Sequence, residues 1–149
     1  MSNGDTLVAR ITPCLENGKT CLVDFLADGQ VGWGSTEYIV LRPRPPLPST
    51  YAYYLARSEV FRTFAIGNMT GTSGRQRVPA ESLAQFAMVH PSNGIAQLFG
   101  RITADSQCAM KANDDEAGTL ATLRNTLLPK LISGELRVKG VERFIVRAI

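Results

Sequence analysis

The C-terminal third of the chain carries a repeating pattern of hydrophobic positions. From Ile95 to Leu127 the steps between these positions alternate between four and three residues, which is the 3.5-residue period of a coiled-coil helix. A helix with one apolar stripe must bury it against another helix. The pattern therefore predicts a long helix over residues 94–130 with a helical partner, from this chain or another. The repeat consists of Ile95, Phe99, Ile102, Ser106, Ala109, Asn113, Glu116, Leu120, Leu123 and Leu127.

The middle of this repeat is polar, because it contains Ser106, Asn113 and Glu116. Polar residues in a coiled-coil seam lower stability but fix register and orientation. This indicates a helix built for a specific partner. Pro129 is expected to disrupt the helix or to mark its last turn.

Short apolar and β-branched runs predict strands in the N-terminal part of the chain. The runs over residues 7–11 and 20–26 are separated by Pro13 and Asn17-Gly18, a combination typical of a hairpin. A third strand is predicted over residues 38–41. It follows a glycine-rich loop that contains Gly29, Gly32 and Gly34.

A proline-rich connector over residues 42–48 should be extended, because proline fits neither a helix interior nor a central strand. Ser49 is then expected to cap one helix that ends at Gly67–Gly71. Its common face would contain Tyr51, Tyr54, Leu55, Ser58, Phe61 and Phe64.

A short turn is expected near residues 80–83 and a strand over residues 86–89. The predicted fold class is α+β: a small mixed or antiparallel sheet with a helix, followed by a long coiled-coil-forming helix. The expected domains are 1–91, the helical arm 92–131 and a tail 132–149.

The composition is that of an ordinary folded protein. The chain has 149 residues, of which 44% are hydrophobic and 19% charged, enough for one core and an appendage. No apolar run approaches the roughly 18 residues of a membrane span, and the first residues lack the blocks of a signal peptide. The three cysteines, an odd number, are expected to be reduced thiols. We therefore expect a cytoplasmic protein that does not enter a membrane.

Positive charge is concentrated in two stretches, residues 57–77 and residues 130–149, of which the second has five basic residues against Glu135 and Glu142. The net charge is only +3, but residues 57–77 contain four arginines against the single carboxylate of Glu59. A solvated basic face explains this stretch, and so does contact with a polyanion such as DNA. Charge alone does not separate the two explanations.

The loop over residues 71–77 is the best candidate for a binding site. Glycines permit positive φ and close approach of the backbone to a ligand. Arginine and glutamine are suited to phosphate or base edges. The alternative is a turn whose arginines pair with local carboxylates or carbonyls. The candidate DNA-binding residues are Gly71, Thr72, Ser73, Gly74, Arg75, Gln76 and Arg77.

No catalytic, cofactor or metal site is predicted. Gly18-Lys19-Thr20 ends like a phosphate-binding P-loop, but the first glycine of that motif would fall at Pro13. His90 is the only histidine, which excludes a histidine-rich metal site. The spacing of Arg42, Pro45 and Pro48 matches a polyproline ligand, yet a connector needs the same residues. A methyltransferase motif, Asn/Asp-Pro-Pro-Tyr/Phe, is absent from the sequence, so we expect a non-catalytic protein.

Five segments in order resemble one family. They are Gly-Asp-Thr-Leu-Val-Ala-Arg-Ile (4–11), Asn-Gly-Lys-Thr (17–20), Ser-Thr-Glu-Tyr-Ile-Val-Leu-Arg-Pro (35–43), Thr-Gly-Thr-Ser-Gly-Arg-Gln-Arg-Val (70–78) and the segment 123–138, which begins Leu-Arg-Asn-Thr-Leu-Leu-Pro-Lys. Together they are similar to specificity subunits of type I restriction–modification enzymes.

The resemblance implies a target-recognition domain that reads double-stranded DNA. It also implies a long helix that packs antiparallel against its counterpart in the other half of the subunit. Methylation and cleavage would belong to a DNA methyltransferase (modification) subunit and a restriction subunit that dock on this scaffold. Members that read different sequences share Gly-Arg-Gln-Arg, which implies that this loop grips phosphate or braces the domain.

The chain also departs from the family pattern. It resembles only the later part of one recognition domain plus one helix. His90-Pro91-Ser92-Asn93-Gly94-Ile95-Ala96-Gln97 stands where many members have Pro-Pro-Leu-x-Glu-Gln, and residues 139–149 match nothing. Two interpretations follow: a half subunit that binds DNA and forms a homodimer through its long helix, or a coiled-coil interaction fragment without DNA binding of its own.

Overall fold

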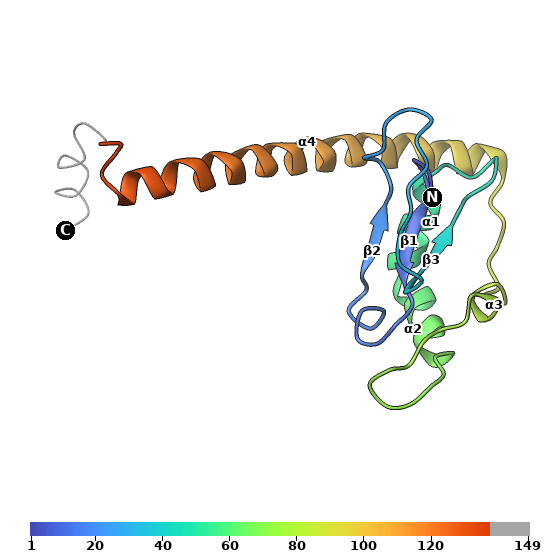
Figure 1. Ribbon diagram of the computed structural model, residues 1–149. Helices are drawn as coiled ribbons and strands as arrows, with labels where there is room; N and C mark the ends of the chain where they lie inside the picture. Colours follow the sequence, from blue (N-terminus) through green and yellow to red (C-terminus); the bar gives the residue numbers. More distant parts are fainter. Residues whose placement is uncertain (138–149) are drawn as a thin grey trace, which may run out of the picture. The chain divides into compact units, whose positions relative to one another are not determined.

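The structure, a computed structural model, describes residues 1–137. Within them a three-stranded antiparallel sheet has the order β2-β1-β3 (Figure 1). Strand β1 (Thr6–Ala9) pairs with β2 (Thr20–Leu22) on one side and with β3 (Tyr38–Leu41) on the other. The predicted hairpin and the third strand are confirmed. The expected tail is described only as far as residue 137; residues 138–149 lie outside the described part.

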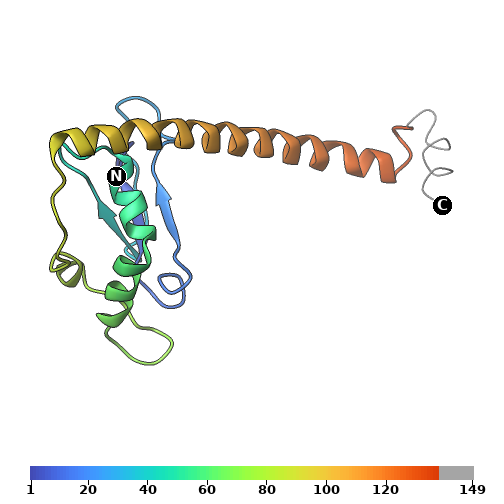
Figure 2. The same cartoon turned by 180° about the vertical axis from the view of Figure 1, so that it is seen from behind.

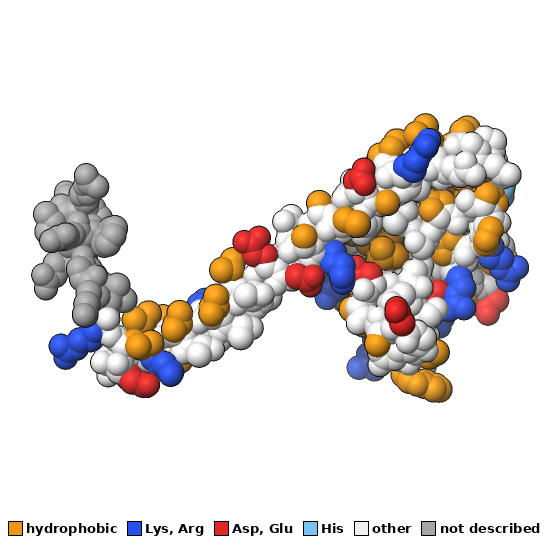
Figure 3. Space-filling view, turned by 90° about the horizontal axis from the view of Figure 1, so that it is seen from above, with side chains coloured by type: hydrophobic (Ala, Val, Ile, Leu, Met, Phe, Trp, Pro, Cys, Tyr) orange, Lys and Arg blue, Asp and Glu red, His pale blue; other side chains and the backbone are white. Residues whose placement is uncertain are grey.

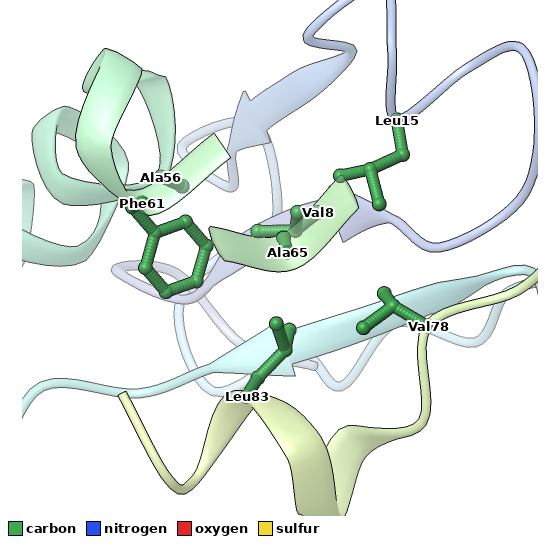
Figure 4. Close-up of a cluster of buried hydrophobic side chains, with 7 residues drawn as sticks. All are labelled: Val8, Leu15, Ala56, Phe61, Ala65, Val78 and Leu83. Atoms are coloured by element: carbon green, nitrogen blue, oxygen red, sulfur yellow. The ribbon is translucent and has the colours of Figure 1, made fainter. Parts of the chain in front are cut away.

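Two helices, α1 (Thr50–Arg57) and α2 (Glu59–Gly67), cover one face of the sheet and lie in front of the strands in Figure 2. Alternate residues of β1 point toward these helices, so that Thr6 and Val8 are buried while Leu7 and Ala9 are only partly covered. The core between the layers, shown in Figure 4, consists of Val8, Leu15, Ala56, Phe61, Ala65, Val78 and Leu83.

The prediction of a single helix from Ser49 is wrong, because the helix is interrupted at Ser58. The backbone of Ser58 is extended (φ −65°, ψ 143°), and its Oγ accepts the N–H of Phe61 at 3.3 Å. Ser58 is thus the cap of a second helix. Ser49 instead has a helical backbone and makes no side-chain cap. The predicted connector over residues 42–48 contains neither helix nor strand and includes a turn at residues 45–47.

The predicted short turn is helix α3 (Ala80–Leu83), whereas the strand predicted over residues 86–89 is wrong. Phe86 packs instead edge-on against Phe61 and Phe64, with ring centroids 5.1 and 5.2 Å apart. An aromatic anchor therefore holds this segment to α2 without ladder hydrogen bonds, and Val89 beyond it is 88% exposed.

The long helix is confirmed as α4 (Asn93–Ile132), with Pro129 in its last turn. The chain divides into two compact units, residues 1–105 and 106–149, so the first turns of α4 belong to the first unit. Ala96 and Thr103 are buried there, and the Thr103 hydroxyl lies 2.7 Å from that of Thr50 on α1. No helix among the described residues is long and apolar enough to cross a membrane.

Candidate nucleic-acid interface

The Gly71–Arg77 loop is closed at its base by strand-like pairing. Thr70 and Arg77 exchange backbone hydrogen bonds of 2.9 and 2.8 Å. The returning segment also bonds to the continuation of β1, where the N–H of Thr12 donates to the carbonyl of Gln76 (3.0 Å) and that of Val78 to Arg10 (2.9 Å). Val78 is fully buried, so the loop springs from the core of the domain.

Two glycines shape the loop. Gly71 has φ 120° and Gly74 has φ 78°, a region that side chains with a Cβ rarely adopt. A Cβ at Gly71 would lie 3.1 Å from the carbonyl oxygen of Arg75, whereas space is open around Gly74. Both glycines thus adopt the positive φ that the sequence analysis said glycine permits, and only at Gly71 would a Cβ also meet a neighbouring atom.

Arg77 is held by Glu37, the residue that precedes β3. Its Nη2 lies 2.8 Å from Oε1 of Glu37, and its Nε lies 2.9 Å from Oε2. The hydrogen bond from Arg77 lowers the pKa of Glu37 and raises that of Arg77, and nearby Arg10 adds to the lowering at Glu37. Arg77 has therefore the pairing expected of a brace for the loop.

The other arginine of the loop is differently placed. Arg75 is exposed, and no hydrogen bond or ion pair of its guanidinium occurs among residues 1–137. Gln76 is half-buried and its carbonyl also accepts the Thr12 hydroxyl at 3.2 Å. The seven predicted residues thus divide into an exposed tip, Gly71–Arg75, and a half-buried support, Gln76 and Arg77.

Further cations lie near this loop, and sequence reasoning did not single them out. Arg10 bonds to the loop through its backbone, and Lys19 is exposed opposite Ala9 in the hairpin, with a backbone bond of 3.0 Å. Arg62 donates to the Glu16 carbonyl at 2.6 Å and so braces the hairpin turn from α2. In the hairpin, residues 6–8 pair with residues 20–22, and Ala9 follows opposite Lys19. The predicted hairpin is the sequence signal that could have placed Lys19 beside the end of β1.

The predicted helix interface is largely exposed. In the first unit Ile95 and Ile102 are 62% and 61% exposed, but Phe99 is half-buried between Tyr51 and Tyr54, with both centroid distances 5.7 Å. The chain's own tyrosines thus contact Phe99, and its place in a helix interface stays a prediction.

In the second unit, apolar side chains line α4 near its described end (Figure 3). Leu120, Leu123 and Leu127 are 57%, 51% and 43% exposed, and Ala109 is exposed as well. Two further leucines that the repeat did not include, Leu128 and Leu131, are 49% and 41% exposed. An apolar stripe of this size on a helix is typical of an interface.

The architecture is thus a small α+β domain with a basic loop, joined to a long helix with exposed apolar residues. No protein-family model matches the chain. The type I restriction enzyme EcoAI specificity subunit of Escherichia coli is 38% identical over 79 residues, which are 52% of this chain and 13% of the relative. The EcoEI specificity subunit of the same organism is 34% identical over 93 residues, 62% of this chain and 16% of the relative.

The resemblance to type I specificity subunits is therefore confirmed by two relatives. The matched segments span less than a fifth of the length of either one. The chain is similar to a segment of such subunits, and the activities and partners of the whole proteins do not follow from the match alone.

Proposed function

We propose that this chain is a DNA-recognition segment of a type I restriction–modification specificity subunit, non-catalytic itself, that works in the cytoplasm. The similarity to the EcoAI and EcoEI specificity subunits carries this proposal. Its partners would be double-stranded DNA, a DNA methyltransferase subunit and a restriction subunit. Purified alone, the chain should neither transfer methyl groups nor hydrolyse ATP nor cut DNA.

The exposed tip of the Gly71–Arg77 loop is the proposed DNA contact. Arg75 can reach a phosphate because no other group of the described chain holds its guanidinium. Backbone N–H groups at a glycine turn can also bind an anion. Lys19 supplies positive charge beside the hairpin turn. A phosphate grip positions a domain without reading bases, which fits a loop shared by proteins with different targets.

The long helix is proposed to form an antiparallel homodimer. The seven-residue repeat is symmetric about Lys111. In an antiparallel pair with that centre, Ile95 would face Leu127 and Ile102 would face Leu120 of the other copy. The polar positions Ser106 and Glu116 would also meet. The apolar N-terminal end of the repeat in one copy thus meets the apolar C-terminal end of the repeat in the other. Each leucine buried in this way would contribute about 1.5–3 kcal/mol to the stability of the dimer.

A salt titration of DNA binding tests the proposed function. The full chain should bind duplex DNA with an affinity that falls steeply as salt rises. Arg75→Ala should weaken binding to every duplex by a similar factor and lower the slope of log K against log salt by about one. The matched control is Arg44→Ala, which removes another exposed arginine, from the connector. It should leave the slope near that of the wild type.

A chain that pairs through α4 but shows no salt-dependent DNA binding would contradict the DNA-recognition proposal. The second candidate, a coiled-coil fragment without DNA binding, would then hold. The exposed leucines of α4 favour that candidate independently of the loop.

A further inference from the structure

The segment over residues 24–37, here named the Trp33 loop, presents a surface that the proposed DNA contact does not use. We propose that it docks a protein partner whose surface combines an apolar pocket with lysine or arginine at the rim. The proposal rests on the proposed function in one respect: the partner to be tested is the methyltransferase subunit of the same restriction–modification system.

Three large apolar side chains of this loop are exposed. Trp33 is 92% exposed, Val31 63% and Phe25 60%. Exposed apolar side chains that are close together often mark an interaction site, whereas single exposed apolar residues are common on any protein surface. Tryptophan in particular is enriched among the residues that dominate the energy of protein interfaces.

The exposure does not come from a loosely attached loop. Gly32 donates its N–H to the Met1 carbonyl at 2.8 Å, and the Met1 amino group donates back to Gly32 at 3.1 Å. The Asn3 side chain both accepts from and donates to the backbone of Leu26, at 3.1 and 2.9 Å. The loop is thus fastened by backbone and amide bonds on both sides of Val31.

Glycines on either side of Trp33 allow the segment to lie close to the rest of the domain. A Cβ at Gly34 would overlap the Tyr38 hydroxyl, and one at Gly32 would lie 2.9 Å from the Met1 side chain. The backbone is therefore packed inward while the indole points out. A backbone held in place in this way loses little conformational entropy when the loop binds a partner.

The charge of the loop selects the class of partner. Residues 24–37 contain three carboxylates and no lysine or arginine. The Trp33 loop is therefore acidic by composition, and Asp28 is exposed between Phe25 and Val31 in the sequence. Such a surface repels phosphate and complements a basic protein surface. The Gly71–Arg77 loop has the opposite character, which separates the two contacts.

The experiment uses Trp33 as its own probe, since it is the only tryptophan of the chain. Trp33 fluorescence of the full chain is measured in the presence of a methyltransferase subunit whose own tryptophans are replaced by 4-fluorotryptophan, which does not fluoresce. Formation of the complex should shift Trp33 emission to the blue and protect it from acrylamide. Duplex DNA alone should do neither.

Two variants separate docking from folding. Trp33→Ala should weaken binding of the methyltransferase subunit by about tenfold or more, while its thermal melt and DNA affinity stay those of the wild type. Val60→Ala is the matched control, because Val60 is 72% exposed on α2 and should change nothing. Asp28→Lys should weaken the complex and reduce its salt dependence.

The outcomes are distinguishable. A complex in which Trp33 stays accessible to acrylamide overturns the docking surface and leaves the proposed function intact. Quenching or a blue shift with DNA alone assigns the loop to DNA and overturns it too. If the wild-type chain binds no methyltransferase subunit at all, the proposed scaffold role fails and the docking surface fails with it.

Discussion

The guanidinium of Arg77 and the carboxylate of Glu37 join two segments that lie 40 residues apart in the chain, through bonds of 2.8 and 2.9 Å. The same arginine closes the loop base through its backbone and donates to the Arg75 carbonyl at 3.4 Å. A side chain engaged in this way already satisfies its charge within the domain. It therefore supports the loop, and Arg75 is left as the arginine of the pair that can meet phosphate.

The first prediction follows from this division of roles. Arg77→Ala should lower the melting temperature by a small amount, because an ion pair at the surface is weak. The salt slope of DNA binding should stay that of the wild type. Glu37→Gln should lower the melting temperature in the same direction, since it removes the same pair. If Arg77→Ala melts like the wild type and lowers the salt slope by about one, Arg77 contacts phosphate instead.

The second prediction concerns pairing through α4. Leu120→Glu with Leu123→Glu should convert the proposed homodimer into a monomer, because carboxylates would replace leucines in an apolar seam. Sedimentation velocity at tens of micromolar measures the change. The double variant Thr122→Glu with Asn125→Glu adds the same charge away from the repeat and should remain dimeric. A monomeric wild type at that concentration would contradict the proposal.

The orientation of the pair is tested separately. In the antiparallel arrangement centred on Lys111, position 102 of one copy faces position 120 of the other. Ile102→Lys combined with Leu120→Glu in one chain should therefore dimerise better than Leu120→Glu alone, because opposite charges meet twice. In a parallel pair like charges would meet at both positions, and the combined variant would be the weaker one.

The third prediction concerns the attachment of α4 to the domain. The hydroxyls of Thr50 and Thr103 are buried and 2.7 Å apart, and Thr103 also donates to the Phe99 carbonyl at 2.8 Å. Because a hydroxyl has one proton, Thr50 must donate to Thr103. Thr103→Val leaves the Thr50 hydroxyl without an acceptor and should cost about 1–3 kcal/mol.

A double-mutant cycle completes this test. Thr50→Val combined with Thr103→Val removes both hydroxyls and should be less destabilising than the two single changes added together. Additive effects in denaturant unfolding would show that the two hydroxyls do not interact.

The hydrophobic pattern was enough to predict β3 and α4, because each follows a strong local pattern, whereas residues 80–83 were expected only as a short turn. It did not predict the break at Ser58, since the apolar face continues through it. Only the extended backbone of Ser58 and its capping bond to Phe61 end one helix and begin the next. The strand expected over residues 86–89 is wrong because the partly buried Phe86 is held by aromatic contacts rather than by pairing in the sheet.

The candidate site was predictable in part for a similar reason. The glycines and arginines of the Gly71–Arg77 loop identify it in the sequence as a candidate binding loop. The partner of Arg77 is Glu37, however, and no local sequence pattern connects these two residues. Likewise Phe99 fits the seven-residue repeat, and its contacts with Tyr51 and Tyr54 arise only when α1 and the first turns of α4 pack together. Contacts between residues far apart in the sequence thus distinguish Arg77, which is paired within the domain, from Arg75, which is exposed.

The fourth prediction concerns stability at low pH. Asp5 is buried, with its two oxygens 2.6 Å from Nε and Nη2 of Arg42 and with Oδ2 2.7 Å from the N–H of Ser2. The hydrogen bond from Arg42 lowers the pKa of Asp5, and desolvation opposes it only in part. Asp5→Asn replaces one accepting oxygen with an NH₂ group, which cannot accept the hydrogen bonds from Arg42 and Ser2. The substitution should lower the free energy of unfolding by about 1–3 kcal/mol near neutral pH.

The sign of the pH dependence follows from the lowered pKa. The unfolded chain binds a proton at Asp5 at a higher pH than the folded chain does, so folding is favoured above the unfolded value of about 3.9. That contribution declines as the pH falls through the lower folded pKa. The difference in melting temperature between wild type and Asp5→Asn should therefore be largest near pH 6 and shrink below about pH 4. Asp28→Asn, at an exposed position, is the matched control and should melt near the wild type. A difference between Asp5→Asn and wild type that stays constant from pH 6 to strongly acidic pH would show that the loss comes from packing and not from the charge of Asp5.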